Sequence, residues 1–237
     1  MKFTGSHILS ISQFERADIE GIFAVADRMV PYAQRQRVTY VLDGAILGSM
    51  FFEPSTRTRV SFGSAFNLLG GAVRETIGFE SSAIAKGESL YDTARVLSGY
   101  SDVIAMRHPQ EGSVAEFAEA SRVPVINGGD GSNEHPSQAL LDLYTIKKEL
   151  QHHGRNDVDG LRIALIGDLK YGRTVHSLCK LLILYSDITI SLISPAELKM
   201  PGAIVEQMRA AGHKVIESDV MEERISHVDI AYSTRIQ

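Results

Sequence analysis

Residues 51–59 read Phe51-Phe52-Glu53-Pro54-Ser55-Thr56-Arg57-Thr58-Arg59 and join an apolar run to the start of a polar helix. The residues at 45–52 are mostly apolar and end at a proline, which is typical of a buried strand. Residues 60–69 then predict a helix that stops at the glycine pair 70–71. A strand that leads directly into a helix is the repeating unit of α/β folds with parallel sheets.

The start of this helix has the features of an anion site. Either Ser55 or Thr56 is predicted to be the N-cap, and the free N–H groups and helix dipole of the first turn favour an anion. Thr56 and Thr58 add hydroxyl donors, and Arg57 adds a guanidinium that matches phosphate oxygens. Arg57 and Arg59 point to nearly opposite sides of a helix, so we expect only Arg57 to hold the anion. The alternative is an ordinary capped helix with two arginines in solvent.

The composition describes an ordinary globular protein. The chain has 237 residues, 44% of them hydrophobic and 22% charged, which allows one large or two moderate domains. A formal net charge of -5 argues against a nucleic-acid-binding protein. The first apolar stretch, residues 8–11, is too short for a signal peptide or a membrane span, so we expect a cytoplasmic protein. The single cysteine, Cys179, excludes an intrachain disulfide, and its apolar neighbours predict a buried helix residue.

Strands and helices alternate along the rest of the chain. Strands are predicted at 102–107, 123–127, 161–167 and 188–193, near 215 and at 228–232. Helices are predicted at 90–97, 113–120, 136–149, 173–184 and 203–211, and a glycine-rich loop at 128–131. This order predicts two doubly wound α/β domains with mainly parallel sheets, at 1–149 and 150–237. We expect the second domain to be incomplete at its C-terminus, because no helix follows its last strand.

Further polar residues are predicted at the carboxyl ends of strands, where ligands of such folds bind. Arg107 ends a strand. His135 and Gln138 lie three residues apart around Pro136 and share one helix face. They offer an imidazole donor for a developing oxyanion and an amide for orientation. Taken singly, two of these residues have a plain alternative. His135 could simply cap the helix, and Arg107 could lie in solvent at the edge of the sheet.

Two loops carry more basic residues. Small residues at 81–89 surround Lys86, which suits either a mobile arm that reaches an anion or a solvated lysine. Residues 167–174 follow a strand but do not spell G-x-G-x-x-G, so we do not expect nicotinamide binding. Lys170 and Arg173 in that loop favour a carboxylate or a phosphate. Arg235 and Gln237 follow the last strand, at the same predicted edge.

The basic residues are predicted to face one cleft between the domains of an acidic protein, which favours small polyanions. They are Arg57, Lys86, Arg107, His135, Arg173 and Arg235. The sequence shows neither metal-ligand spacing nor paired catalytic carboxylates. We therefore expect group transfer that depends on positioning and oxyanion stabilisation, without a metal or an organic cofactor.

Several of these segments resemble the transcarbamoylase family. Residues 55–59, 86–89 and 135–138 carry the resemblance to the whole family, and residues 167–174 and 234–237 are similar to its aspartate carbamoyltransferases. Ornithine carbamoyltransferases share the first motifs but have an asparagine-rich loop in place of residues 168–173. The resemblance implies a carbamoyl phosphate domain followed by an aspartate domain.

The resemblance also implies roles for individual residues. The carbamoyl phosphate ligands would be Ser55, Thr56, Arg57, Thr58, Ser82, Lys86, Arg107, His135 and Gln138. The aspartate ligands would be Lys86, Arg173, Arg235 and Gln237. The residues that take part in catalysis would be Arg57, Thr58, Lys86, Arg107 and His135. Thr58, Arg107 and His135 would polarise the carbonyl oxygen, Gln138 would orient the carbamoyl amide, and Glu53 would couple domain closure through an ion pair.

The implied activity forms N-carbamoyl-L-aspartate and phosphate, a step of pyrimidine biosynthesis. Ser82 and Lys86 would reach a neighbouring subunit's site, so a homotrimer would be the smallest active unit; a larger assembly with regulatory chains is compatible with this. Because family members continue through a further loop, sheet and helix, we expect residues 1–237 alone to lack full activity. The alternatives are an ornithine carbamoyltransferase, a catalytically silent relative that serves as a scaffold, and a plain anion-binding module.

Overall fold

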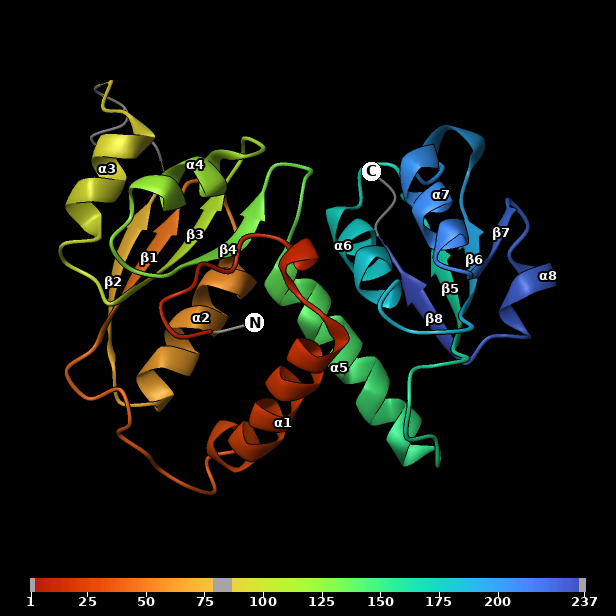
Figure 1. The fold of residues 1–237 in the computed structure, drawn as a ribbon, viewed down its shortest axis with the longest axis horizontal. Coiled ribbons are helices and arrows are strands. Elements are labelled where there is room, and N and C mark those ends of the chain that lie inside the picture. Colours follow the sequence, from red (N-terminus) through yellow and green to blue (C-terminus); the bar gives the residue numbers. More distant parts are fainter. Residues whose placement is uncertain (1–2, 79–86, 235–237) are drawn as a thin grey trace. The chain divides into compact units, whose positions relative to one another are not determined.

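The computed structural model describes residues 3–78 and 87–234, and its contacts divide the chain into two compact units, Met1–Ser137 and Gln138–Gln237. Each unit contains one four-stranded sheet (Figure 1). Every strand pair in both sheets is parallel. The prediction of an α/β fold with two parallel sheets is therefore confirmed.

The first unit has strand order β2-β1-β3-β4. Its strands are β1 (Ile46–Phe51), β2 (Ala72–Ile77), β3 (Val103–His108) and β4 (Val125–Asp130). Its helices are η1 (Ile11–Gln13), α1 (Arg16–Ala33), α2 (Thr56–Leu68), α3 (Leu90–Leu97) and α4 (Ser113–Ala120). In Figure 1, α2 lies on one side of this sheet and α3 and α4 lie on the other. The chain leaves β1 toward β2 and later continues from β3 toward β4, so the order reverses between β1 and β3.

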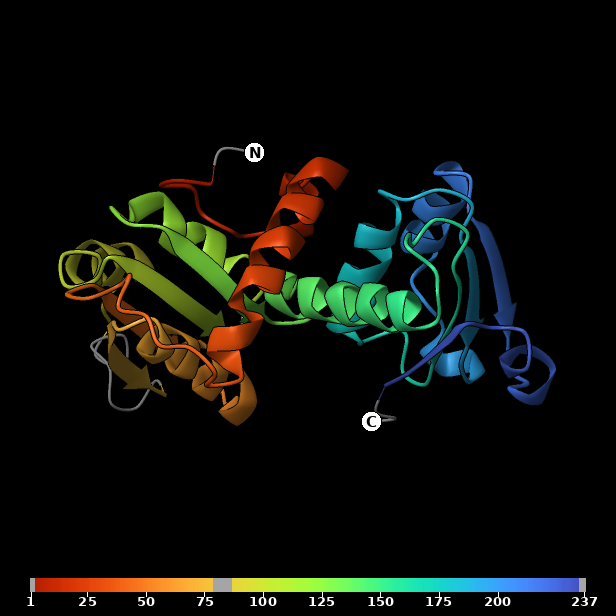
Figure 2. The same cartoon turned by 90° about the horizontal axis from the view of Figure 1, so that it is seen from below.

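The second unit has strand order β7-β6-β5-β8. Its strands are β5 (Arg162–Ile166), β6 (Thr189–Ile193), β7 (Lys214–Ser218) and β8 (Ile230–Ser233). Its helices are α6 (Arg173–Leu182), η3 (Ala196–Leu198), α7 (Gly202–Ala210) and α8 (Glu222–Ile225), and α5 (Pro136–His152) crosses the unit boundary in its first turn. Figure 2 shows α6 and α7 on the same side of the sheet. Here the order reverses between β5 and β8.

Apolar side chains from each sheet and its helices form the cores. In the first unit, Met50, Ile104 and Met106 of the strands pack with Val114 and Phe117 of α4, and all five are buried. Full burial of one such side chain contributes about 1.5–3 kcal/mol. In the second unit the fully buried residues include Cys179 of α6, as its apolar neighbours predicted. These cores fix where the strands end, and so where the polar loops begin.

The structure differs from the sequence predictions in several places. The glycine-rich segment 128–131 was predicted to be a loop; this is wrong for residues 128–130, which belong to β4, whereas Gly131 begins the turn that follows. Pairing with β3 extends the strand: after a register shift, His108 is the partner of Asp130. α1 and β2 lie outside the predicted segments, and α5 ends three residues later than predicted. Within the described part of the chain, no helix is both long and apolar enough to cross a bilayer.

Candidate active site

The N-terminus of α2 follows directly from β1. Of the two predicted candidates, Ser55 is the N-cap, but its hydroxyl makes no capping hydrogen bond to the helix. The first hydrogen bond of the helix runs from the N–H of Arg59 to the carbonyl of Ser55. The earlier N–H groups therefore have no carbonyl partner within the helix, and Thr56 and Arg57 are exposed to solvent. Backbone donors, hydroxyls and one guanidinium are thus available to an anion at this point.

The two arginines of α2 have different environments. Arg59 Nη1 lies 2.8 Å from Glu75 Oε2 on β2, so its charge is already paired. Arg57 is exposed, and the residues that the structure describes offer its side chain no hydrogen bond or ion pair. The plain alternative placed both arginines in solvent; Arg57 is exposed as it expects, whereas Arg59 is paired with Glu75.

Arg107, at the end of β3, lies beside the end of β1. It is the register partner of Phe51. Its Nε lies 2.5 Å from Glu53 Oε1, its Nη1 donates to the carbonyl of Gly128 at 3.2 Å, and its side chain is only 11% exposed. A Cβ added at Gly128 would lie 3.7 Å from Thr58 Cγ2, so Thr58 and Arg107 both adjoin Gly128. The donors after β1 and β3 therefore lie together where the strand order reverses, the usual ligand position in such sheets.

His135 is held by the turn that precedes α5. The residue is 4% exposed, and its Nδ1 lies 3.2 Å from the hydroxyl of Ser137. The preceding residue, Glu134, accepts from the Ser10 hydroxyl at 2.9 Å and from the Ile11 N–H at 2.7 Å. Glu134 thus fixes the turn to the N-terminal segment, a role for which its sequence context gave no signal.

Asp130 organises the same turn from within. Asp130 is 2% exposed, and its carboxylate accepts four hydrogen bonds, each of 3.0–3.2 Å. The donors are Gly112 N, Asn127 Nδ2, Asn133 Nδ2 and Glu134 N. Because β4 pairs with β3 at Asp130, this network brings the His135 turn to the edge of the sheet that carries Arg107.

His108 follows Arg107 but is not a cationic donor. It is buried, and burial lowers its pKa from the ordinary value of 6.5. Its Nδ1 accepts a hydrogen bond from the N–H of Gln110 at 3.0 Å, and its ring lies 5.6 Å from that of Phe52. A neutral, packed imidazole at this position supports the loop after β3.

In the second unit, Asp168 shapes the loop between β5 and α6. It is buried, and its Oδ1 accepts from the N–H groups of Lys170 at 3.1 Å and Tyr171 at 3.0 Å. A Cβ at Gly172 would lie 2.6 Å from the carbonyl oxygen of Asp168, so the loop needs glycine there. Arg173 is the first residue of α6 and is half-buried.

The end of β8 packs against this loop. Gly167 has a φ of +112°, and a Cβ there would lie 2.6 Å from Thr234 Oγ1. The Thr234 hydroxyl donates to the carbonyl of Ile166 at 3.1 Å. Thr234, the last described residue of the chain, therefore lies beside the loop that precedes Arg173.

Gln138 makes a contact that sequence reasoning missed. Its Nε2 donates to Asp142 Oδ1 at 2.8 Å, and Tyr232 of β8 donates its hydroxyl to Asp142 Oδ2 at 2.9 Å. Burial raises the pKa of the Asp142 carboxyl and raises the pKa of Tyr232 to about 12. The four-residue spacing of Gln138 and Asp142 was a usable signal, because residues i and i+4 share a helix face.

Some predicted site residues lie outside the described residues: Ser82, Lys86, Arg235 and Gln237. The others are distributed between the two units, so the single cleft stays a prediction. Among residues 3–78 and 87–234, no group of three or more His, Cys, Asp or Glu side chains is placed to hold a metal ion.

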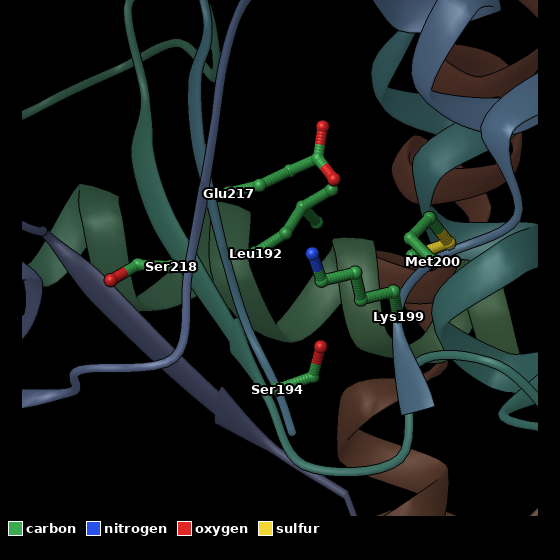
Figure 3. Close-up of a pocket in the computed structure, with 6 residues that line it drawn as sticks. All are labelled: Leu192, Ser194, Lys199, Met200, Glu217 and Ser218. Carbon is green, nitrogen blue, oxygen red and sulfur yellow. The ribbon is translucent and has the colours of Figure 1, made fainter. Parts of the chain in front are cut away.

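A small pocket lies elsewhere in the second unit, at the carboxyl ends of β6 and β7. It is lined by Leu192, Ser194, Lys199, Met200, Glu217 and Ser218. Figure 3 shows the side chain of Lys199 extending between Glu217 and Ser194. None of the predicted site residues lines it.

Comparison with known proteins matches the chain to the models of two domains. Residues 6–148 match the model of the aspartate/ornithine carbamoyltransferase carbamoyl-P binding domain. Residues 159–237 match the model of the Asp/Orn binding domain of the same enzymes. Together the two models cover most of the chain.

Curated relatives and solved structures agree with the two family models. The chain is 76% identical to the aspartate carbamoyltransferase catalytic subunit of Saccharophagus degradans and 73% identical to that of Cellvibrio japonicus, over all of this chain and 70% of each relative. The fold superposes with a TM-score of 0.90 on aspartate transcarbamoylase from Trypanosoma cruzi in complex with carbamoyl aspartate and phosphate, at 41% identity over 98% of this chain and 75% of that one. The catalytic subunit from M. jannaschii gives the same TM-score at 45% identity, over 98% of this chain and 74% of that one. The chain belongs to the aspartate/ornithine carbamoyltransferase family.

Proposed function

We propose that this chain transfers the carbamoyl group of carbamoyl phosphate to the amine of L-aspartate. The products are N-carbamoyl-L-aspartate and phosphate, in pyrimidine biosynthesis. Two relatives at 73–76% identity are named aspartate carbamoyltransferase catalytic subunits. Structures of the Trypanosoma cruzi relative contain carbamoyl phosphate, aspartate, or N-(phosphonacetyl)-L-aspartic acid.

The observation that carries the proposal is the convergence of donors at the first reversal point. Arg107 and Thr58 both adjoin Gly128, and the open N-terminus of α2 with Arg57 follows the neighbouring strand β1. This set suits a phosphate group attached to a polarised carbonyl. The charge of Arg57 is available to phosphate oxygens, while Arg107 is oriented by Glu53.

The chemistry follows from these donors. The neutral amine of aspartate attacks the carbonyl carbon of carbamoyl phosphate, and the carbonyl oxygen becomes an oxyanion. Thr58, Arg107 and His135 stabilise this charge, and one such donor is typically worth a factor of about 100–1000 in rate. The bond from the carbonyl carbon to the phosphate oxygen then breaks. The departing phosphate takes the proton that the amine loses, so no separate base is needed.

The second unit would select aspartate. Arg173 opens α6, and Arg235 and Gln237 follow β8, whose end packs against the loop before α6. Guanidinium groups bind carboxylates in a bidentate geometry and repel an ammonium group. An aspartate side chain is therefore favoured over the cationic side chain of ornithine.

The quaternary structure is proposed from the family resemblance. Ser82 and Lys86 would complete the site of a neighbouring subunit in a cytoplasmic homotrimer. A mixture of two inactive variants, Lys86→Ala and Arg57→Ala, would then recover activity, because hybrid trimers contain some sites with neither substitution.

Product formation tests the function directly. The full-length enzyme is expected to form carbamoyl aspartate from carbamoyl phosphate and L-aspartate, and no citrulline from L-ornithine. Citrulline formation would support an ornithine enzyme instead. Phosphate binding without transfer to either amine would show a silent relative or an anion-binding module.

A further inference from the structure

The carboxylate of Asp142 lies between two side chains that are far apart in sequence. Gln138, one turn earlier on α5, donates its Nε2 to Oδ1 at 2.8 Å. Tyr232, on β8, donates its hydroxyl to Oδ2 at 2.9 Å. The carboxylate thus receives one hydrogen bond on each oxygen, from an amide and from a phenol.

The chemistry of the carboxylate fixes which way the amide turns. An ionised carboxylate only accepts hydrogen bonds, whereas a glutamine amide has an NH₂ end that donates and an oxygen end that accepts. Next to Asp142 the Gln138 amide must therefore present its NH₂ group, which directs Oε1 away from Asp142. The opposite orientation would place two oxygens with no proton between them at hydrogen-bond distance.

Tyr232 holds the carboxylate in this position. Its phenol donates to the second oxygen, and burial raises the pKa of Tyr232 to about 12, so the group keeps its proton at neutral pH. All three side chains are half-buried, which limits competition from water. The orientation of the Gln138 amide is therefore imposed by the network and does not depend on a ligand.

We propose that Asp142, held by Tyr232, is a positioning residue that directs the Gln138 carbonyl oxygen toward the NH₂ group of the carbamoyl substrate. This inference rests on the proposed function. The substrate's NH₂ group can only donate, so it needs an acceptor, and Gln138 Oε1 is one. The same arrangement disfavours an acyl phosphate that carries a methyl group in place of the NH₂, because Oε1 would then lose its donor. Asp142 thereby contributes to selection of a carbamoyl group over an acetyl group.

The test compares two ligands that differ in the amide. Phosphonoacetamide keeps a phosphonate and a terminal carboxamide, and inorganic phosphate lacks the carboxamide. Binding of each to the full-length protein is measured by calorimetry. Asp142→Asn keeps the shape of the side chain but can offer an NH₂ group, which allows Gln138 to turn over. We expect Asp142→Asn to lower the affinity for phosphonoacetamide about 10–100-fold and to change the affinity for phosphate by no more than about twofold.

Two further variants make the comparison specific. Tyr232→Phe keeps the carboxylate but removes its support, and should weaken phosphonoacetamide by a smaller factor, about 3–10-fold. Thr145→Ala is a control on α5, because within the described part of the chain the hydroxyl of the exposed Thr145 bonds only to the Leu141 carbonyl of its own helix. This variant should change the affinity for neither ligand. In the enzyme assay, Asp142→Asn should raise the rate with acetyl phosphate relative to carbamoyl phosphate.

The outcomes distinguish a failure of the positioning role of Asp142 from a failure of the proposed function. Equal weakening of both ligands by Asp142→Asn, or no weakening of either, would overturn the positioning role while leaving the proposed function intact. If the unsubstituted protein binds phosphonoacetamide no better than phosphate, the amide is not recognised and the positioning role is overturned. If the full-length protein forms no carbamoyl aspartate from carbamoyl phosphate and L-aspartate, the proposed function itself fails, and the inference fails with it.

Discussion

The guanidinium of Arg107 is paired with the carboxylate of Glu53, and the Nε of the arginine lies 2.5 Å from Oε1 of the glutamate. The two residues end neighbouring strands, Arg107 within β3 and Glu53 two positions after β1. Their side chains are 11% and 21% exposed, so the pair is shielded from solvent more than an ordinary surface ion pair. Glu53 thus orients a donor of the proposed oxyanion site and also competes with substrate for its charge.

Replacement of Glu53 by glutamine should therefore separate binding from catalysis. We expect Glu53→Gln to strengthen inorganic phosphate binding severalfold, because Arg107 loses a competing carboxylate, and to lower kcat about 10–100-fold, because the guanidinium is less well oriented. Glu75→Gln is the matched control, since Glu75 pairs at 2.8 Å with Arg59 on the outer side of α2. The role of Glu53 would be rejected if both variants changed kcat by the same factor.

The two arginines of α2 provide a second paired comparison. Arg57→Ala should lower the affinity for phosphate and for carbamoyl phosphate about 10–100-fold, because hydrogen bonds from a charged donor contribute about 1.5–3 kcal/mol. Arg59→Ala should change both affinities by no more than about twofold, since the guanidinium of Arg59 is already paired with Glu75. Calorimetric titration with phosphate measures both. Equal effects of the two substitutions would contradict the assignment of the anion to Arg57.

Asp130 should be required for stability as well as activity. Asp130→Asn keeps the size of the side chain but replaces one accepting oxygen with a donor, so buried donors in the turn lose their partner. We expect the first unit to lose about 2–4 kcal/mol of unfolding free energy. Amide hydrogen exchange should accelerate at Gly112 and Glu134, whose N–H groups bond to this carboxylate.

A graded control accompanies this variant. Asn133→Ala removes only one of the four donors, from an exposed residue, and should cost less than about 1 kcal/mol. Unchanged exchange at Gly112 in the Asp130→Asn protein would show that the network does not hold the turn.

The fold could be predicted from sequence where local signals and tertiary structure agree. α4 was predicted with its observed bounds, Ser113–Ala120, and α5 begins at Pro136 because proline fits the first helical turn. β4 was predicted too short because Gly128 and Gly129 look like a loop, whereas the strand continues through them across a register shift and pairs with β3 again at Asp130. α1 contains a proline at position 31, a residue that usually ends or kinks a helix, and it buries only three of its residues.

The candidate site likewise combines residues that local sequence features predict with contacts that they do not predict. Ser55, Arg57, His135 and Gln138 follow from their positions at helix starts, which are local features. Contacts across long sequence separations could not be predicted: Arg107 with Glu53, 54 residues apart, and Tyr232 with Asp142, 90 residues apart. Such pairs depend on which strands are neighbours in the sheet, and no single sequence segment predicts the strand order of either sheet.

The buried thiol of Cys179 should be chemically inert in the folded protein. It is 0% exposed on α6, and burial raises its pKa to about 12, so about one thiol in ten thousand is ionised near pH 8. A disulfide reagent such as Ellman's should react with it only after denaturation. Since this is the only cysteine, Cys179→Ala gives the blank for the assay. Rapid reaction under native conditions would place the thiol in an accessible position.

Asp229 should stabilise the second unit in a pH-dependent way. It lies just before β8 and accepts hydrogen bonds from Arg162 Nη2 at 2.6 Å, Arg155 Nη1 at 2.8 Å and the Arg162 N–H at 2.9 Å. Burial alone would raise the pKa of Asp229, but the hydrogen bonds from Arg162 and Arg155 outweigh it, and the pKa falls below the ordinary 3.8. A carboxyl with a lowered pKa in the folded state contributes stability above its unfolded pKa and loses it as the pH falls through the folded one.

Asp229→Asn should therefore lower the free energy of unfolding by about 1–2 kcal/mol at neutral pH. The deficit should remain constant down to about pH 5 and shrink below about pH 4, because the native carboxylate is then protonated as well. Urea denaturation across this range measures the difference. Glu217→Gln serves as the control, since Glu217 is paired at 3.1 Å with an Arg209 side chain that is 52% exposed, and such pairs contribute little. A deficit that grows toward acidic pH would have the wrong sign and would show that Asp229 does not act through its charge.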